Sequence, residues 1–211
     1  MASKKKKKDK SQPRRPKVNL MAGIPRPKPI DLYTSVEIPD QVREYPFYGA
    51  WLMEGWEDRG ITPVVVARRQ ADDDNIIFGM YMVDLFCLGV KDALWKGDLN
   101  SKQFNRQLPQ LCGDMPEPCE VSLAHEVIYG SIDFARKYGF EPHRDFRKAG
   151  LILDPPETLS WKHKLEFGKD GKPLFIPGPY DNARQILNQL KRTAGEGNYN
   201  ALMMLNGPDD L

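Results

Sequence analysis

The stretch TPVVVARRQADDDNIIFGMYMVDLFCL, residues 62–88, decides the fold of this chain. Residues 62–70 contain three consecutive valines, and residues 76–88 are almost continuously apolar. The short, acidic segment 71–75 between them has the polarity of a solvated turn. Two apolar runs on either side of such a turn predict a β-hairpin. The apolarity of the second run predicts a central strand that is covered on both faces.

Two helices are expected after this hairpin. Residues 101–111 and 122–138 carry apolar side chains at helical spacing. Each begins with a serine that can cap the first turn, Ser101 and Ser122. Gly139 suits the position that ends the longer helix. Between the hairpin and the first helix, the sequence indicates only the end or a bend of the second strand.

A second hairpin is predicted near the C-terminal end of the chain. Asp170-Gly171 lies between the runs 161–167 and 174–176. This dipeptide favours a type I′ turn, because both of its residues tolerate a positive φ. A further helix is expected to begin at Asp181, which can cap it.

Together these elements predict an α+β fold, in which two hairpins build a mainly antiparallel sheet that packs with two to three helices in a single domain. The expected organisation is a disordered basic tail at 1–30, an aromatic-rich lead-in at 31–60 and a globular domain at 61–206. No apolar run reaches the roughly 18 residues of a membrane-spanning helix. Three cysteines are too few for a disulfide framework and indicate a cytoplasmic protein.

The charge of the chain is divided unequally between the tail and the rest. Residues 1–28 hold eleven basic side chains and one acidic one, a net charge of +10. The whole chain has 31 basic and 29 acidic residues, so the remainder has 20 and 28, a net charge of −8. A polycationic segment indicates a polyanionic partner, most often nucleic acid.

We therefore expect a binding protein whose tail contacts RNA or DNA by neutralising phosphates. Trp161 and the lysines of the second hairpin are expected to add a stacking and charge contact on the folded body. The predicted nucleic-acid-binding residues are Lys4, Lys5, Lys6, Lys7, Lys8, Lys10, Arg14, Arg15, Lys17, Trp161, Lys169 and Lys172. The acidic body is expected to bind a partner of its own, which can be a protein.

Four residues are the candidates for a catalytic site: Asp84, Asp92, His125 and Glu126. Asp84 lies in an apolar run and Asp92 follows closely, as carboxylates that hold a divalent metal in nucleases can do. His125-Glu126 begins like the zinc-protease helix motif, but Tyr129 replaces its second histidine, so no metal site is predicted. A metal-dependent nuclease or other hydrolase is thus the alternative function. It requires these side chains to meet in one cleft.

A protein-interaction or assembly module is the third possibility. It depends on whether an aromatic group in the lead-in is core or exposed interface. This group consists of Tyr45, Phe47, Tyr48, Trp51 and Trp56. The sequence contains no motif for a cofactor, and it favours a binding protein over an enzyme.

Three blocks of sequence carry a resemblance. They are GMYMVDLFCLGVKD at 79–92, AHEVIYG at 124–130 and FGKDGKPLF at 167–175. Together they resemble an uncharacterised bacterial protein family over about residues 45–205. The resemblance implies a shared domain, to which no activity is attached, and it transfers no catalytic residue. The basic tail lies outside the resembling region.

Overall fold

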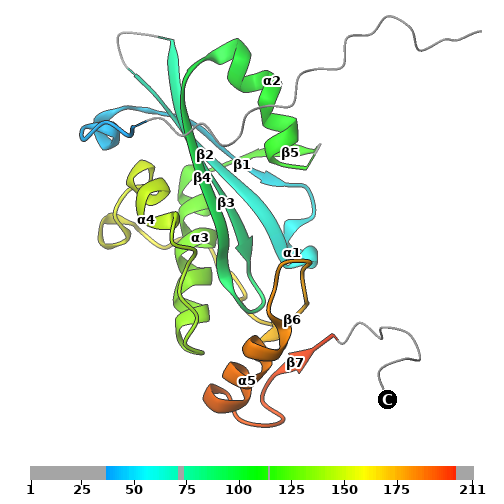
Figure 1. The fold of residues 1–211 in the computed structure, drawn as a ribbon. Helices are drawn as coiled ribbons and strands as arrows, with labels where there is room; N and C mark the ends of the chain where they lie inside the picture. The colour runs from blue at the N-terminus through cyan, green and yellow to red at the C-terminus, as the bar shows by residue number, and fades with distance from the viewer. Residues whose placement is uncertain (1–36, 71–73, 114, 203–211) are drawn as a thin grey trace, which may run out of the picture. The chain divides into compact units, whose positions relative to one another are not determined.

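The computed structural model describes residues 37–70, 74–113 and 115–202. The chain divides into two units, Met1–Ile30 and Asp31–Leu211, and all of the described residues belong to the second. Its centre is a five-stranded antiparallel sheet with the order β4-β3-β2-β1-β5 (Figure 1). The strands are β1 (Phe47–Met53), β2 (Ile61–Arg69), β3 (Asn75–Asp84), β4 (Gly89–Asn100) and β5 (Pro116–Cys119). The predicted α+β class with a mainly antiparallel sheet is confirmed.

The first predicted hairpin is the pair β2 and β3. The strands stay in register from Ile61 opposite Asp84 to Arg69 opposite Ile76. Both are covered on both faces for most of their length, as their continuous apolarity predicts. The predicted strand at 76–88 is shorter in the structure, because β3 ends at Asp84 and residues 85–88 form a turn. Residues 89–92, where that strand was expected to end or bend, are the beginning of β4. Strand β4 is an edge strand with mixed burial, so its sequence lacks the continuous apolar run of its neighbour.

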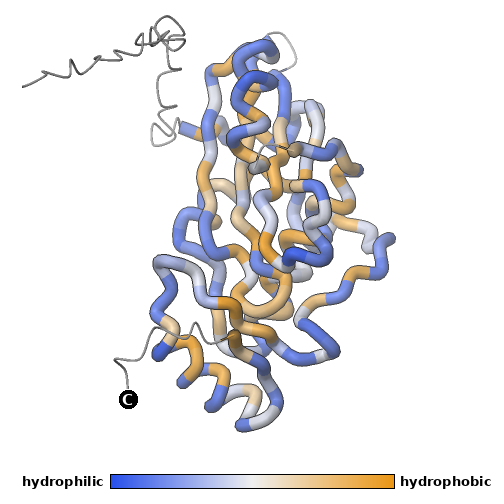
Figure 2. Tube along the Cα trace, turned by 90° about the vertical axis from the view of Figure 1, so that its right-hand side faces the viewer, coloured by the Kyte–Doolittle hydropathy of each residue, from blue (hydrophilic) through white to orange (hydrophobic). Residues whose placement is uncertain are grey.

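Two helices cover opposite faces of the sheet. Helix α3 (Val121–Arg136) packs on one face, where it joins a core that includes Val64, Tyr81 and Val127. Helix α2 (Ser101–Leu111) packs through Phe104 on the other face, near one end of the strands (Figure 1). Hydrophobic positions are concentrated along the strands and the hydrophilic ones on the outer turns (Figure 2).

The ends of these helices differ slightly from the prediction. Asn100, not Ser101, caps α2, because its side chain accepts the Gln103 N–H in a reciprocal capping box. Helix α3 follows Glu120 without a side-chain cap, so Ser122 lies inside it. Gly139 adopts a φ of +78° after the helix, the left-handed conformation that was expected of it.

Shorter elements complete the described chain. The helices are α1 (Trp56–Arg59), α4 (Phe146–Ala149) and α5 (Ala183–Thr193). The 3₁₀ turns are η1 (Val42–Glu44), η2 (Gly150–Ile152) and η3 (Pro156–Thr158). Strands β6 (Leu174–Phe175) and β7 (Asn200–Ala201) form a separate parallel pair. No helix in the described ranges is both long and apolar enough to cross a bilayer.

The sheet begins inside the segment that was predicted to be a lead-in. Strand β1 pairs with both β2 and β5. The rings of Tyr48 and Trp51 lie 5.6 Å and 5.3 Å from the ring of Phe104 in α2, and Trp56 is buried. These aromatic side chains therefore contribute to the core, which weakens the case for an aromatic interface at this segment.

The second predicted hairpin forms its turn but not its strands. Asp170 and Gly171 have φ values of 52° and 74°, and Lys169 and Lys172 exchange two backbone hydrogen bonds of 2.7 Å and 3.0 Å. The prediction of a strand at 161–167 is wrong. Two N–H groups of that segment bond to a carboxylate on α3 instead of to a partner strand. Strand β6 pairs in parallel with β7.

The C-terminal part of the described chain packs against the turn between β3 and β4. The N–H groups of Gly168 and Leu174 donate to the carbonyls of Leu85 and Phe86, at 2.9 Å and 3.0 Å. Helix α5 is capped by Asn182, not by Asp181 as predicted. The Asp181 carboxylate instead forms an ion pair of 2.6 Å with Lys91 on β4 and accepts the Gly178 N–H at 2.8 Å.

Candidate functional site

A buried arginine organises the polar interior between β2 and the segment after α4. Arg68 is 2% exposed, and its guanidinium donates to three carbonyls and one carboxylate. The acceptors are Ile152 O at 2.6 Å, Arg43 O at 3.1 Å, Tyr45 O at 2.7 Å and Asp154 Oδ1 at 2.6 Å. Burial lowers the pKa of Arg68, and the bond to Asp154 opposes that shift. The arginine stays charged at neutral pH and is matched by one carboxylate.

His125 uses both ring nitrogens for structure. It is 1% exposed; Nδ1 lies 2.8 Å from Val121 O, and Nε2 lies 3.0 Å from the Asp154 N–H. Because the amide can only donate, Nε2 accepts and Nδ1 carries the proton. Burial lowers the pKa of His125, so the neutral ring persists at pH 7. No free nitrogen is left for a metal or a proton transfer.

Glu126, the next residue, holds the irregular segment that was predicted to be a strand. Its carboxylate is 1% exposed and accepts the N–H groups of Lys162 and His163 at 2.7 Å and 2.9 Å. Burial raises the pKa of Glu126, but these hydrogen bonds and the His163 side chain, whose Nδ1 lies 3.2 Å from Oε2, together outweigh it, so the pKa is lowered overall. Both carboxylate oxygens are thus occupied in positioning the chain.

The two aspartates serve two further local roles. Asp84 Oδ1 accepts the N–H groups of Phe86 and Cys87 at 2.9 Å and 3.0 Å, which holds the turn after β3. Asp92 on β4 is exposed, and its Oδ1 accepts the N–H of Ala93 at 2.8 Å. The four catalytic candidates therefore have four separate sets of partners. In the described ranges no three His, Cys, Asp or Glu side chains are grouped so as to hold a metal ion.

The predicted body contacts for nucleic acid lie on exposed surface. Trp161 is 50% exposed, and Lys169 and Lys172 flank the exposed turn. A cavity of about 270 Å³ that includes Lys169 is lined by basic and by acidic side chains. Its charged lining residues are Lys164, Lys169, Glu57, Asp58 and Glu166. The acids offset the lysines there. Lys4–Lys17 of the tail prediction lie outside the described residues.

A second cavity has a different charge balance. It has a volume of about 300 Å³, and we call it the arginine pocket. It is lined by Arg43, Tyr129, Ile132, Asp133, Arg136, Phe146, Arg147, Gly150, Leu151 and Pro156. Three arginines face one aspartate in this lining, a net charge of +2.

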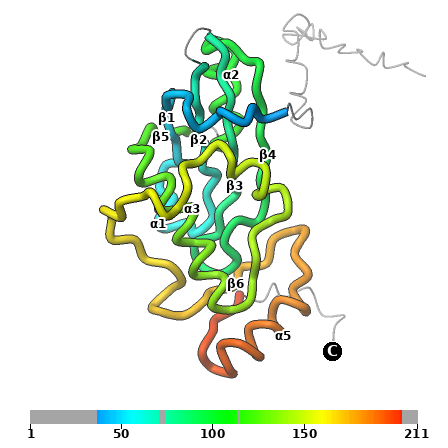
Figure 3. The backbone as a smooth tube through the Cα atoms, turned by 90° about the vertical axis from the view of Figure 1, so that its left-hand side faces the viewer, coloured from blue at the N-terminus to red at the C-terminus, as the bar shows by residue number. Residues whose placement is uncertain are grey.

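Several elements build the arginine pocket. Helix α3 contributes Tyr129, Ile132, Asp133 and Arg136, whose spacing places them on one helix face. The opposite wall comes from η1, α4, η2 and η3. In Figure 3 the blue chain around η1 lies beside the yellow segment that contains η2, in agreement with a 2.9 Å hydrogen bond from Arg43 Nε to Leu153 O.

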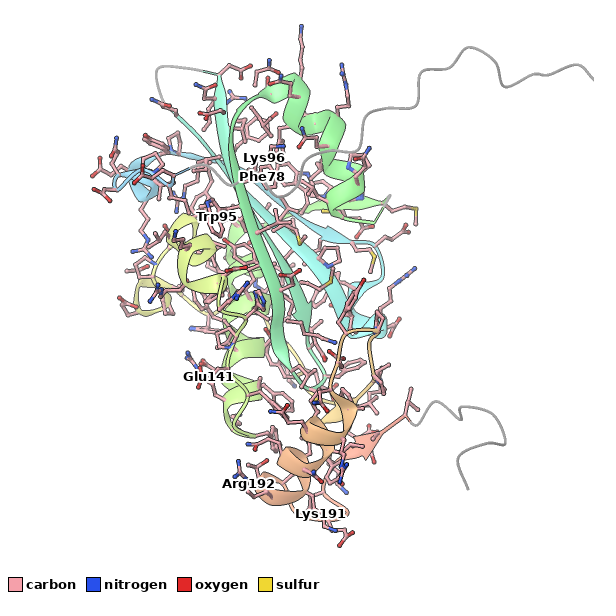
Figure 4. The ribbon with its side chains drawn as sticks, in the orientation of Figure 1. Phe78, Trp95, Lys96, Glu141, Lys191 and Arg192 are labelled. Carbon is pink, nitrogen blue, oxygen red and sulfur yellow. The ribbon has the colours of Figure 1, made fainter. Side chains whose placement is uncertain are left out.

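The three arginines of the pocket differ in whether their guanidinium groups already have hydrogen-bond or ion-pair partners. Arg136 Nε donates at 3.1 Å to Glu141, which lies beyond the C-terminal end of α3 (Figure 4). Arg43 is anchored through Nε, which leaves its two terminal NH₂ groups for a ligand. Arg147 is exposed and has no hydrogen bond or ion pair with another described side chain. Two guanidinium groups are thus available to an anion.

The Tyr129 side of the pocket is connected to the buried side chains of Arg68 and His125 through Asp154. The Tyr129 hydroxyl donates to Asp154 O at 2.9 Å, and burial raises the pKa of Tyr129 to about 12. Its ring packs edge-on against Phe146, with ring centres 6.3 Å apart. Arg68, His125 and Asp154 therefore hold the pocket wall in place without lining it. Sequence reasoning missed this site, because its arginines lie at 43, 136 and 147, with no motif that connects them.

No match to this chain is found among protein-family models, curated proteins or solved structures.

Proposed function

We propose that this protein binds nucleic acid. The tail supplies sequence-independent attraction to phosphates, and the arginine pocket supplies a contact on the folded body. The observation that carries the proposal is the charge of residues 1–28, eleven basic side chains against one acidic. Lysine and arginine at this density release condensed counterions from a nucleic acid backbone, which gives affinity without sequence preference.

The hydrolase alternative has less support from the site. Asp84, His125 and Glu126 each bond through their side chains to backbone atoms. We also propose a cytoplasmic location. Cys87, Cys112 and Cys119 are free thiols, as expected in a reducing compartment. Cell fractionation tests the location.

The first test is binding of labelled RNA and DNA by the full chain across a salt series. The comparison variant replaces Lys4, Lys5, Lys6, Lys7 and Lys8 by glutamine. The logarithm of the wild-type binding constant should fall steeply with the logarithm of salt concentration, and the variant should lower that slope by up to about 4, because each neutralised phosphate contributes about 0.7–0.9.

A matched control replaces five exposed lysines of the body instead. These are Lys102, Lys137, Lys148, Lys164 and Lys191, which lie outside the arginine pocket. The control has the same net charge as the tail variant. Equal losses in the two variants would mean that net charge, and not the tail, drives binding. Absence of binding by the wild type at low salt would refute the proposed function.

A further inference from the structure

The lining of the arginine pocket combines three kinds of surface. Arg43 and Arg147 supply donors for an anion. Phe146 and Tyr129 supply aromatic rings, and Leu151 supplies an apolar side chain that is 43% exposed. A ligand that complements this lining has an anionic group next to a flat, largely apolar one.

The charge of the lining limits how much negative charge a bound anion can carry. Its net charge of +2 includes Arg136, which is already paired with Glu141. Asp133 contributes the negative charge of the lining, and Glu157 lies close enough to affect Tyr129. A single phosphate group fits this balance, whereas a polyphosphate would place several negative charges near both carboxylates.

The pocket is also prepared for such a ligand. Arg43 is fixed at its Nε by Leu153 O, and its own carbonyl accepts a bond from Arg68. The Phe146 ring packs edge-on against both Tyr81 and Tyr129, at 5.9 Å and 6.3 Å between ring centres. Binding groups held in this way lose little conformational entropy when a ligand enters.

We infer that the arginine pocket receives one unpaired nucleotide of a single-stranded nucleic acid. Its phosphate binds between Arg43 and Arg147, and its base packs against Phe146 and Leu151. This inference rests on the proposed function and adds a substrate class to it. A base inside a duplex is stacked and paired, so it must leave the helix before it can enter a cavity of about 300 Å³. A base in a single strand enters at a much lower cost.

The test uses the full chain and a labelled oligothymidylate, as a single strand and as a duplex with its complement. The main variant is Arg147→Gln, which removes an exposed side chain with no partner among the described residues. The matched control is Arg144→Gln, three residues earlier. Its side chain is 87% exposed, it lies outside the pocket, and its Nε is 3.6 Å from Asp145.

We expect Arg147→Gln to weaken single-strand binding by about tenfold and to lower the salt slope by about 1, as for the loss of one phosphate contact. Duplex binding should change less than about twofold, and Arg144→Gln should change neither by more than about twofold. Leu151→Ser should weaken single-strand binding without changing the salt slope, because it removes packing and no charge.

Two results would overturn the inference while leaving the proposed function intact. One is equal single-strand binding by the Arg147→Gln and Arg144→Gln variants, which would show that the pocket holds no phosphate. The other is an equal loss of single-strand and duplex binding in Arg147→Gln, which would make the pocket a general basic surface. Failure of the wild type to bind either form would instead refute the proposed function itself.

Discussion

Arg68, His125 and Glu126 are polar residues buried in the interior of the described unit, and each has at least one hydrogen-bond partner in the backbone of residues 152–163. Each side chain bonds to backbone groups of residues 152–163 that lack a partner in a strand or a longer helix, because those residues are mostly irregular. A buried polar group with all its partners stabilises one arrangement of the chain and is costly to lose. The adjacent His125 and Glu126 are therefore positioning residues of the fold.

The first prediction concerns Arg68. Arg68→Met removes four hydrogen bonds and leaves Asp154 with an unmatched charge. We expect the free energy of unfolding to fall by about 3–5 kcal/mol, because the carbonyls of Ile152, Arg43 and Tyr45 lose their donor and each unsatisfied buried acceptor costs about 1–3 kcal/mol. Urea denaturation followed by tryptophan fluorescence measures it.

The neighbouring Arg69 is a matched control for this experiment. Its side chain is 42% exposed and lies 3.8 Å from Asp74. Arg69→Met should cost less than about 1 kcal/mol, since exposed ion pairs contribute little. A similar cost for both variants would contradict the central role of the Arg68 network.

The second prediction concerns Asp84 and pH. Burial raises the pKa of Asp84 from 3.8 to about 6, although Lys91 and three N–H groups oppose the shift. Because the folded pKa is above the unfolded one, the folded state binds more protons between these values. Stability from this group is present below about pH 4 and is lost as the pH rises to about 6, by up to about 3 kcal/mol.

Asp84→Asn should remove this dependence. The amide oxygen can still accept the N–H groups of Phe86 and Cys87, and the side chain no longer ionises. The difference in melting temperature between variant and wild type should therefore grow in favour of the variant from pH 4 to pH 6.5. A constant difference over this range would show that Asp84 does not titrate with a raised pKa.

At the scale of elements, the irregular segment 153–168 is attached to α3 at several points, two of which lie next to each other on the helix. One of these two is the Glu126 carboxylate, and the other is the contact between Gly130 and Phe167. A Cβ atom at Gly130 would lie 2.6 Å from Phe167 Cε2, closer than packed carbon atoms approach. The glycine thus lets a loop lie directly on a helix, at the cost of weaker helix propensity.

The third prediction follows from this contact. Gly130→Ala should lower the free energy of unfolding by about 1 kcal/mol, because the clash with Phe167 exceeds the gain in helix propensity of roughly 1 kcal/mol. In a Phe167→Ala background the same substitution should be stabilising, since the clash is gone and the propensity gain remains. Thermal unfolding of the four chains measures the coupling. Stabilisation by Gly130→Ala in both backgrounds would contradict the contact.

At the scale of the whole molecule, two parts of the sequence have opposite charge. Residues 1–28 carry a net +10 and the remainder a net −8. The buried residues that form the described core lie between Val42 and Leu190. The variant with glutamine at Lys4, Lys5, Lys6, Lys7 and Lys8 should therefore have the same melting temperature as the wild type in the absence of nucleic acid. Added nucleic acid should raise the melting temperature of the wild type more than that of the variant.

The sequence by itself determined the α+β class, the β2–β3 hairpin, helices α2 and α3, and the turn at Asp170-Gly171. These are local signals, because periodicity, caps and turn residues act over a few positions along the chain. Only the tertiary structure decided that a further strand, β4, begins at Gly89 and that residues 161–167 are not a strand. It also brought Arg43, Arg136 and Arg147 to one pocket and gave His125 two backbone partners. Those outcomes depend on which distant groups satisfy each buried polar atom, and no spacing in the sequence encodes that choice.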